Sequence, residues 1–90
     1  MANLTIEDRR SIISELELNL ANGEIAIGEA IKLIRTRLYG MTQTQYAQFI
    51  NVSDKTLRDI EKGNTDPRLS IVNRLLAPGG FQLSASKIQR

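Results

Sequence analysis

The chain contains neither cysteine nor histidine among its 90 residues. Without cysteine there is no disulfide framework and no thiolate chemistry. Without histidine, the commonest metal ligand and the usual near-neutral base are both missing. The sequence also has no glycine-rich phosphate loop. We therefore expect no enzymatic activity, no cofactor and no metal site.

Long apolar runs are also absent. No stretch approaches the roughly 18 to 20 apolar residues that a membrane span needs, and the opening MANLTIEDRR has no apolar stretch behind its charges. We expect a cytoplasmic protein with no membrane partner. Apolar residues make up 41% of the chain, which is enough for one compact core but not for a deep catalytic pocket as well.

The charges are unevenly distributed, although the formal net charge is only +2. Residues 1–30 contain two Arg and six Asp or Glu, whereas residues 31–90 contain ten Lys or Arg and four Asp or Glu. Such asymmetry is expected when one part of a chain meets a phosphate backbone and another part does not. The alternative is an accidental sorting of solvated charges.

Apolar residues recur at helical spacing, and capping residues divide them into five predicted helices. Thr5 begins the first helix, with Asp8 three residues later in a pattern like a capping box, and Asn22-Gly23 ends it. Its predicted apolar face consists of Ile6, Ile13, Leu16 and Leu20. The other helices are predicted over residues 26–38, 43–50 and 54–62, and from residue 68 or 69 to the break at Pro78-Gly79-Gly80.

The third and fourth predicted helices are short and joined by a tight turn, so they must pack at a steep angle. This packing needs a small residue at the crossing, which Ala47 supplies, and a residue that tolerates positive φ in the turn, which Asn51 supplies. Ser53 is placed to cap the fourth helix. The branched residues that would lock the two helices together are Ile50, Val52, Leu57 and Ile60.

The segment MTQTQYAQFINVSDKTLRDIEKGNTDP resembles the phage repressor and Cro-like helix-turn-helix domains, the XRE family. The residues that carry the resemblance are Gln43, Ala47, Val52-Ser53, Leu57, Glu61, Gly63 and Pro67. The resemblance covers about residues 26–77. It implies an all-α, lambda-repressor-like, five-helix helix-turn-helix domain over residues 24–78, with an added N-terminal helix within residues 1–23. Residues 79–90 would form a short C-terminal strand, predicted from the alternation in Phe81-Gln82-Leu83-Ser84, and a tail.

The resemblance also implies a set of DNA contacts. The exposed face of the fourth helix would enter the major groove with Asp54, Lys55, Thr56, Arg58 and Asp59. Gln43 would contact either a phosphate or a base at the edge of the site, and Ser53 would contact a phosphate. The loop after the fourth helix contains side chains of the types that commonly bind phosphate: Lys62, Asn64, Thr65 and Arg68.

Lys55 and Arg58 are the best base-reading candidates, because Lys and Arg can engage the O6 and N7 acceptors of guanine. A carboxylate would read DNA only by accepting from cytosine N4. The alternative for this face is two exposed helix ion pairs, Asp54 with Arg58 and Lys55 with Asp59, both spaced i to i+4. Asp54 also suits the positive end of the helix dipole.

Glu61 occupies a position that in the family often pairs with an Arg on the helix before the motif. Counting back from Gln43, the usual spacing of that Arg lands on Thr36. A one-residue difference in the connection would restore Arg35 as the partner, so an Arg35–Glu61 pair is a hypothesis of the sequence.

Domains of this kind usually bind operator DNA as dimers, with reading helices about 34 Å apart. Phe81 and Leu83 would be buried if the predicted strand paired with its twin across a two-fold axis, so a homodimer is expected. The alternative for this segment is a frayed tail. The acidic N-terminal helix offers a second surface for a protein partner, although its apolar stripe is also what core packing requires.

A second and looser resemblance, to the HipB antitoxins, rests on Leu75-Leu76, Gly79-Gly80 and the Phe81 to Ser84 strand. It implies a repressor of its own operon that binds a HipA-type kinase toxin. The extra N-terminal helix and the short tail depart from that pattern. The leading interpretation is thus a sequence-specific repressor and autoregulating antitoxin. The alternatives are a stand-alone or phage-type regulator and a protein-interaction module without DNA binding.

Overall fold

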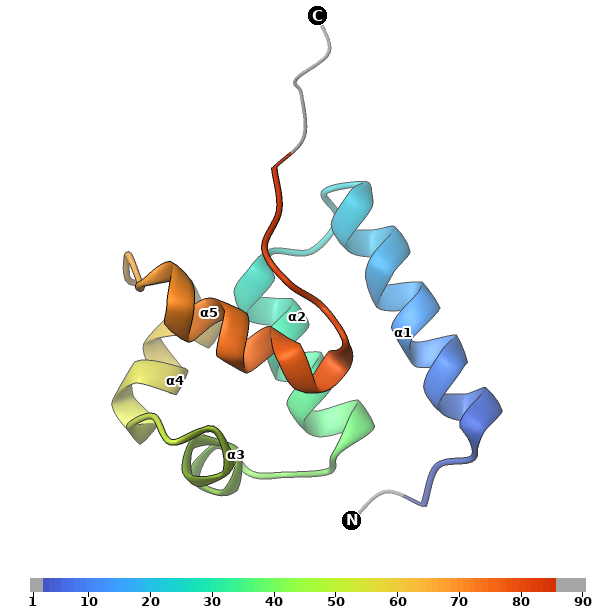
Figure 1. Cartoon of the computed structure of the whole chain (residues 1–90), viewed down its shortest axis with the longest axis horizontal. Coiled ribbons are helices and arrows are strands. Elements are labelled where there is room, and N and C mark those ends of the chain that lie inside the picture. The colour runs from blue at the N-terminus through green and yellow to red at the C-terminus, as the bar shows by residue number, and fades with distance from the viewer. Residues whose placement is uncertain (1–2, 86–90) are drawn as a thin grey trace, which may run out of the picture.

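The computed structural model describes residues 3–85, which form five α-helices (Figure 1). These are α1 (Ile6–Ala21), α2 (Ile27–Leu33), α3 (Gln43–Ile50), α4 (Asp54–Lys62) and α5 (Leu69–Leu76). A π-helical turn, η1 (Ile34–Leu38), continues α2, and a 3-10 turn, η2 (Ala77–Gly79), follows α5. No helix in this part of the chain is both long enough and apolar enough to cross a bilayer.

Side-chain caps begin three of the helices at the predicted residues. The Thr5 hydroxyl accepts from the Asp8 N–H at 3.0 Å, and the Asp8 carboxylate accepts from the Thr5 N–H at 3.1 Å. Thr42 and Gln45 form the same reciprocal pair before α3. Each cap satisfies backbone donors that the first turn of a helix leaves without a partner. These helix boundaries are therefore fixed by local sequence.

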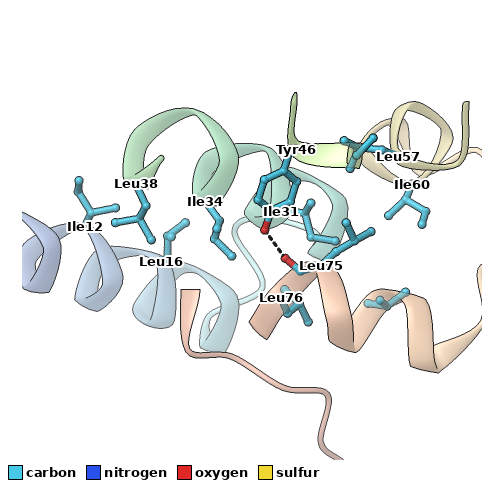
Figure 2. Packing of buried hydrophobic residues seen from close by; sticks show 12 residues of the cluster. Ile12, Leu16, Ile31, Ile34, Leu38, Tyr46, Leu57, Ile60, Leu75 and Leu76 are labelled. Carbon is cyan, nitrogen blue, oxygen red and sulfur yellow. Dashed lines mark hydrogen bonds between the residues drawn. The ribbon is translucent and has the colours of Figure 1, made fainter. Parts of the chain in front are cut away.

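The core lies at the junction of all five helices (Figure 2). Tyr46 is fully buried there, and its hydroxyl donates to the Leu75 carbonyl at 2.7 Å, which ties α3 to α5. Burial raises the pKa of the Tyr46 hydroxyl, so the group remains a neutral donor. From α1, Ile12 and Leu16 join this core. The helix thus packs its apolar stripe against its own chain.

One predicted member of that stripe is wrong, because Ile6 is 71% exposed. It lies in the first turn of α1, whereas the buried pair Ile12 and Leu16 is spaced i to i+4 further along the helix. Polar contacts also hold α1 in place. The Arg9 guanidinium lies 5.7 Å from the centre of the Tyr39 ring, within the range of a cation–π contact.

Gly28 lets α2 and α4 approach closely. A Cβ atom at residue 28 would lie 2.2 Å from the Ile60 carbonyl oxygen and 2.9 Å from that of Glu61. No side chain fits at that separation, so glycine is required where the end of α4 crosses α2. The contact fixes the position of α4 against the rest of the bundle.

The predicted C-terminal strand is wrong for the part of the segment that the structure describes. Residues 81–85 form no strand, since within residues 3–85 no second strand is present to complete a ladder. The Phe81 N–H instead donates to the Leu76 carbonyl at 3.3 Å, and the Leu83 N–H to the Asn73 Oδ1 at 2.7 Å. Phe81 and Leu83 are half-buried against the helical core. The rest of the predicted tail, residues 86–90, lies outside the described residues.

The arrangement separates the acidic and basic parts of the chain. In Figure 1, α1 lies on one side of the molecule and α4 on the other, with α2 and α5 between them. The acidic helix α1 therefore lies away from the helix predicted to read DNA.

Candidate nucleic-acid interface

Helices α3 and α4 form a compact pair around a left-handed turn. Asn51 has φ 66° and ψ 51°, a conformation that Asn tolerates better than most residues. The next residue, Val52, donates its N–H to the Ala47 carbonyl at 2.9 Å. Ala47 and Leu57 are fully buried, and Ile60 is 4% exposed. These buried contacts and the single left-handed residue set the angle between α3, of eight residues, and α4, of nine residues.

Ser53 begins α4 with a side-chain cap. Its Oγ accepts from the Thr56 N–H at 3.0 Å and donates to the Thr56 Oγ1 at 2.8 Å. The Ser53 hydroxyl is exposed but already engaged within the first turn, and Thr56 is half-buried beside it. Of the residues predicted for DNA contact, these two thus also stabilise the start of the reading helix.

Two exposed cations, Lys55 and Arg58, lie on the outer face of α4. The Lys55 Nζ lies 2.7 Å from the Asp59 Oδ2, so one of the two alternative ion pairs is formed. The hydrogen bond from Lys55 holds the pKa of the Asp59 carboxyl below its usual value. The other pair is not formed: Asp54 accepts instead from the Thr44 hydroxyl at 2.6 Å. Arg58 has no ion-pair partner among residues 3–85.

Behind this face, a buried ion pair joins η1 to the last turn of α4. The Arg35 Nε lies 2.8 Å from the Glu61 Oε2, and the Arg35 Nη2 donates to the Glu61 Oε1 at 3.0 Å. The two side chains are 9% and 4% exposed. Arg35 also donates to the Met41 carbonyl at 2.9 Å, and the Gln43 Nε2 donates to the Glu61 Oε1 at 3.0 Å. One carboxylate therefore orients both the guanidinium and the amide at the start of α3.

The π-helical turn explains how Arg35 reaches Glu61 although residue counting favours Thr36. A π turn contains one residue more than an α turn, because its hydrogen bonds span five residues instead of four. The end of this helix shows the same extension. The Gly40 N–H donates to the Thr36 carbonyl and the Met41 N–H to that of Arg35, each one residue further back than the corresponding bonds at Gly23 and Gly63, which follow α1 and α4. The extra residue is thus absorbed inside the helix.

The loop between α4 and α5 presents polar side chains next to the end of the reading helix. Gly63, at φ 73°, ends α4, and the Asn64 N–H donates to the Asp59 carbonyl at 3.0 Å. The side chains predicted to contact phosphate here are exposed: Lys62, Asn64, Thr65 and Arg68. Gln43 is half-buried at the start of α3. The residues predicted to contact phosphate at the start of α3, at the end of α4 and in the loop between α4 and α5 thus lie in the same part of the molecule.

The contacts of two residues in this region, Thr44 and Arg74, are not predicted by the sequence. Thr44 fixes the Asp54 carboxylate from the neighbouring helix. Arg74, on α5, donates to the carbonyls of Ile50 and, at 3.2 Å, of Asn51, and so satisfies acceptors at the end of α3 that the helix itself leaves free. Neither contact has a signal in local spacing, because each joins two different helices.

Two short helices crossing around one left-handed residue, with the second helix exposing cations, define a helix-turn-helix protein. Comparison with known proteins agrees with this fold. Residues 31–80 match the family model described as helix-turn-helix. The chain is also similar to an uncharacterized HTH-type transcriptional regulator of Haemophilus influenzae, with 33% identity over 78 residues, covering 87% of this chain and 79% of that protein. No solved structure shows a significant match. The chain belongs to the helix-turn-helix family, of the XRE type.

Proposed function

We propose that the protein is a sequence-specific transcriptional repressor that reads operator DNA with α4. The observation that supports this proposal most directly is that Arg58, on the outer face of α4, is an exposed cation with no ion-pair partner among residues 3–85. Family membership supports a DNA-binding regulator, and the related protein from Haemophilus influenzae is named a transcriptional regulator.

The proposed DNA contacts fall into two groups, those that recognise bases and those that bind phosphates. Arg58 and Lys55 would read base edges, since a guanidinium or ammonium matches the guanine acceptors in the major groove. The Lys55–Asp59 contact does not oppose this role, because exposed i to i+4 pairs are weak and exchange readily. Lys62, Asn64, Thr65, Arg68 and the oriented Gln43 amide would position the protein on phosphates.

A gel-shift titration on the DNA upstream of the protein's own gene tests the proposal. Each neutralised phosphate contributes a slope of about −0.9 to the dependence of log affinity on log salt, so binding should weaken steeply as salt rises. Arg58→Ala and Lys55→Ala should each cost about 1–3 kcal/mol on the cognate site and relax base preference, whereas Lys62→Ala should weaken all sequences alike. Failure to bind any DNA in a salt-sensitive manner would contradict the proposal.

The antitoxin role is a finer proposal, and it depends on the looser HipB resemblance. The Phe81 to Ser84 part of that resemblance is not a strand in the described chain, which leaves Leu75-Leu76 and Gly79-Gly80 as its support. Purification from the native host distinguishes the alternatives. A co-purifying kinase toxin supports the antitoxin, and a repressor that copurifies with no protein supports the stand-alone regulator. A protein complex without DNA binding supports the interaction module.

A further inference from the structure

The two carboxylates predicted on the outer face of α4 are held in different ways. The Asp59 Oδ2 lies 2.7 Å from the Lys55 Nζ of the same helix, so an ammonium offsets its charge. Asp54 accepts at its Oδ2 from the Thr44 hydroxyl of α3 at 2.6 Å. No cation pairs with Asp54 in the described part of the chain. Asp54 is thus fixed by a neutral partner and keeps its full capacity as an acceptor.

The position of Asp54 favours contact with base edges. In helix-turn-helix domains the N-terminal residues of the reading helix meet the bases, and Asp54 is the first residue of α4, whereas Asp59 is the sixth. Asp54 also lies one turn before Arg58 on the same face, where an unrestrained carboxylate would pair with the guanidinium. The hydrogen bond from Thr44 holds the carboxylate against α3 instead. Both side chains therefore remain available to DNA.

A fixed carboxylate in the major groove selects cytosine. A carboxylate can only accept hydrogen bonds, and the two bases that offer a donor in this groove are cytosine, at N4, and adenine, at N6. Adenine also presents its N7 acceptor beside the donor, and that acceptor repels a carboxylate. Within residues 3–85 the Asp54 Oδ1 makes no hydrogen bond. This oxygen is therefore the atom that can accept from cytosine N4.

We propose that Thr44 is a positioning residue for base recognition, which holds Asp54 so that its Oδ1 accepts from the N4 amino group of a cytosine in the operator. This role rests on the proposed function, because it requires α4 in the major groove. A side chain that is already fixed in the free protein loses less conformational entropy on binding. It is also kept from swinging towards the phosphates, which would repel it. Thr44 thus determines specificity without touching a base.

Thr44→Val tests the proposal, because valine keeps the shape of threonine and removes the hydroxyl. Thr44→Ser is the matched control, since it retains the donor. Binding sites are selected from a random pool of duplexes with the wild type, and affinities are then measured with each base at every selected position. Wild type and Thr44→Ser should prefer cytosine at one position, and Thr44→Val should reduce that preference by about threefold to tenfold. Far-UV circular dichroism checks that every chain is folded.

Variants of the two carboxylates separate positioning from direct contact. Asp54→Ala should abolish the cytosine preference, whereas Asp59→Ala should leave it unchanged. Asp54→Asn places an amide donor where Oδ1 stood, so its preference should move from cytosine to a base with an acceptor. In the Asp54→Ala background, Thr44→Val should have no further effect on base preference. A Thr44→Val effect that persists in this background would show that Thr44 touches DNA itself and would overturn the proposal.

The remaining outcomes distinguish this role from the proposed function. Sequence-specific binding without a cytosine preference in the wild type, or with an unchanged preference in Thr44→Val, would overturn the role of Thr44 alone. A wild type that binds no DNA would overturn the proposed function as well. In the DNA-free protein, NMR scalar couplings should report one χ1 rotamer for Asp54 in wild type and Thr44→Ser, and an average of rotamers in Thr44→Val. An averaged rotamer in the wild type would also refute the positioning role.

Discussion

The buried pair of Arg35 and Glu61 offers a direct test of how this motif is held together. Glu61→Leu leaves the Arg35 guanidinium in a site where its side chain is only 9% exposed, with the Met41 carbonyl as its remaining acceptor. Removing one partner of a buried ion pair costs about 3–5 kcal/mol. A domain of this size is stable by only about 5–15 kcal/mol, so the single substitution should remove a large part of the total.

The double variant Arg35→Met/Glu61→Leu should be less destabilised than either single variant. Replacing both charges with apolar side chains leaves no unpaired charge in the core, and such replacements are often neutral or stabilising. The matched control is Glu15→Leu, which removes the exposed pair between Glu15 and Arg37. That pair joins atoms 3.4 Å apart on side chains that are 56% and 42% exposed, and it should contribute less than about 1 kcal/mol.

Urea unfolding followed by far-UV circular dichroism measures these differences through the midpoint of the transition, provided the slope m is unchanged. A Glu61→Leu variant no less stable than Glu15→Leu would refute the reasoning, as would a double variant that loses the sum of the two single costs. The double variant also lacks the carboxylate that orients the Gln43 amide. Its DNA affinity should therefore fall even though its fold is retained.

Three further predictions concern backbone geometry and surface charge. Gly28→Ala should destabilise the fold by about 1–3 kcal/mol or more in urea, because its Cβ would meet the Ile60 carbonyl; unchanged stability would show that α2 and α4 are further apart. At Asn51, with φ 66°, Ala should cost about 1–2 kcal/mol while Gly does not, since left-handed backbone disfavours a Cβ. The Asp59 carboxyl should titrate below pH 3.8 by NMR, and Lys55→Met should raise its pKa towards that value. Because the folded-state pKa is lowered, the Lys55–Asp59 contact is present above the ordinary carboxyl pKa and is lost as pH falls through the lowered one.

The parts of the fold that local chemistry decides could be predicted from the sequence. Thr5 and Thr42 indicate the starts of helices because each forms its capping hydrogen bonds with the residue three positions later. Asn51 and Gly63 mark helix ends because few residues adopt positive φ. The bounds of α3 follow from Thr42 and Asn51, and those of α4 from the Ser53 cap and Gly63. These residues also locate the candidate site.

The parts that depend on contacts between helices could not be predicted in the same way. Periodicity placed Ile6 on a buried face, but a helix longer than the core it covers leaves its first turn exposed. The alternation around Phe81 suits an extended chain, yet a strand exists only where another chain segment supplies hydrogen bonds. Arg74 reaches the end of α3 from α5, and no spacing along the sequence indicates that contact.

The π turn at Ile34–Leu38 has a consequence for how chains of this family are compared. An added residue inside a helix normally rotates everything beyond it by about 100°, which would turn Arg35 away from Glu61. Here the wider turn takes up the extra residue, so the helix keeps its buried face on both sides of the insertion. A gap-free alignment that counts back from Gln43 would assign the ion pair to Thr36 and judge it lost, whereas one that allows a single-residue insertion after Arg35 recovers it. Relatives with the shorter spacing are expected to have an ordinary α-helical turn at this point.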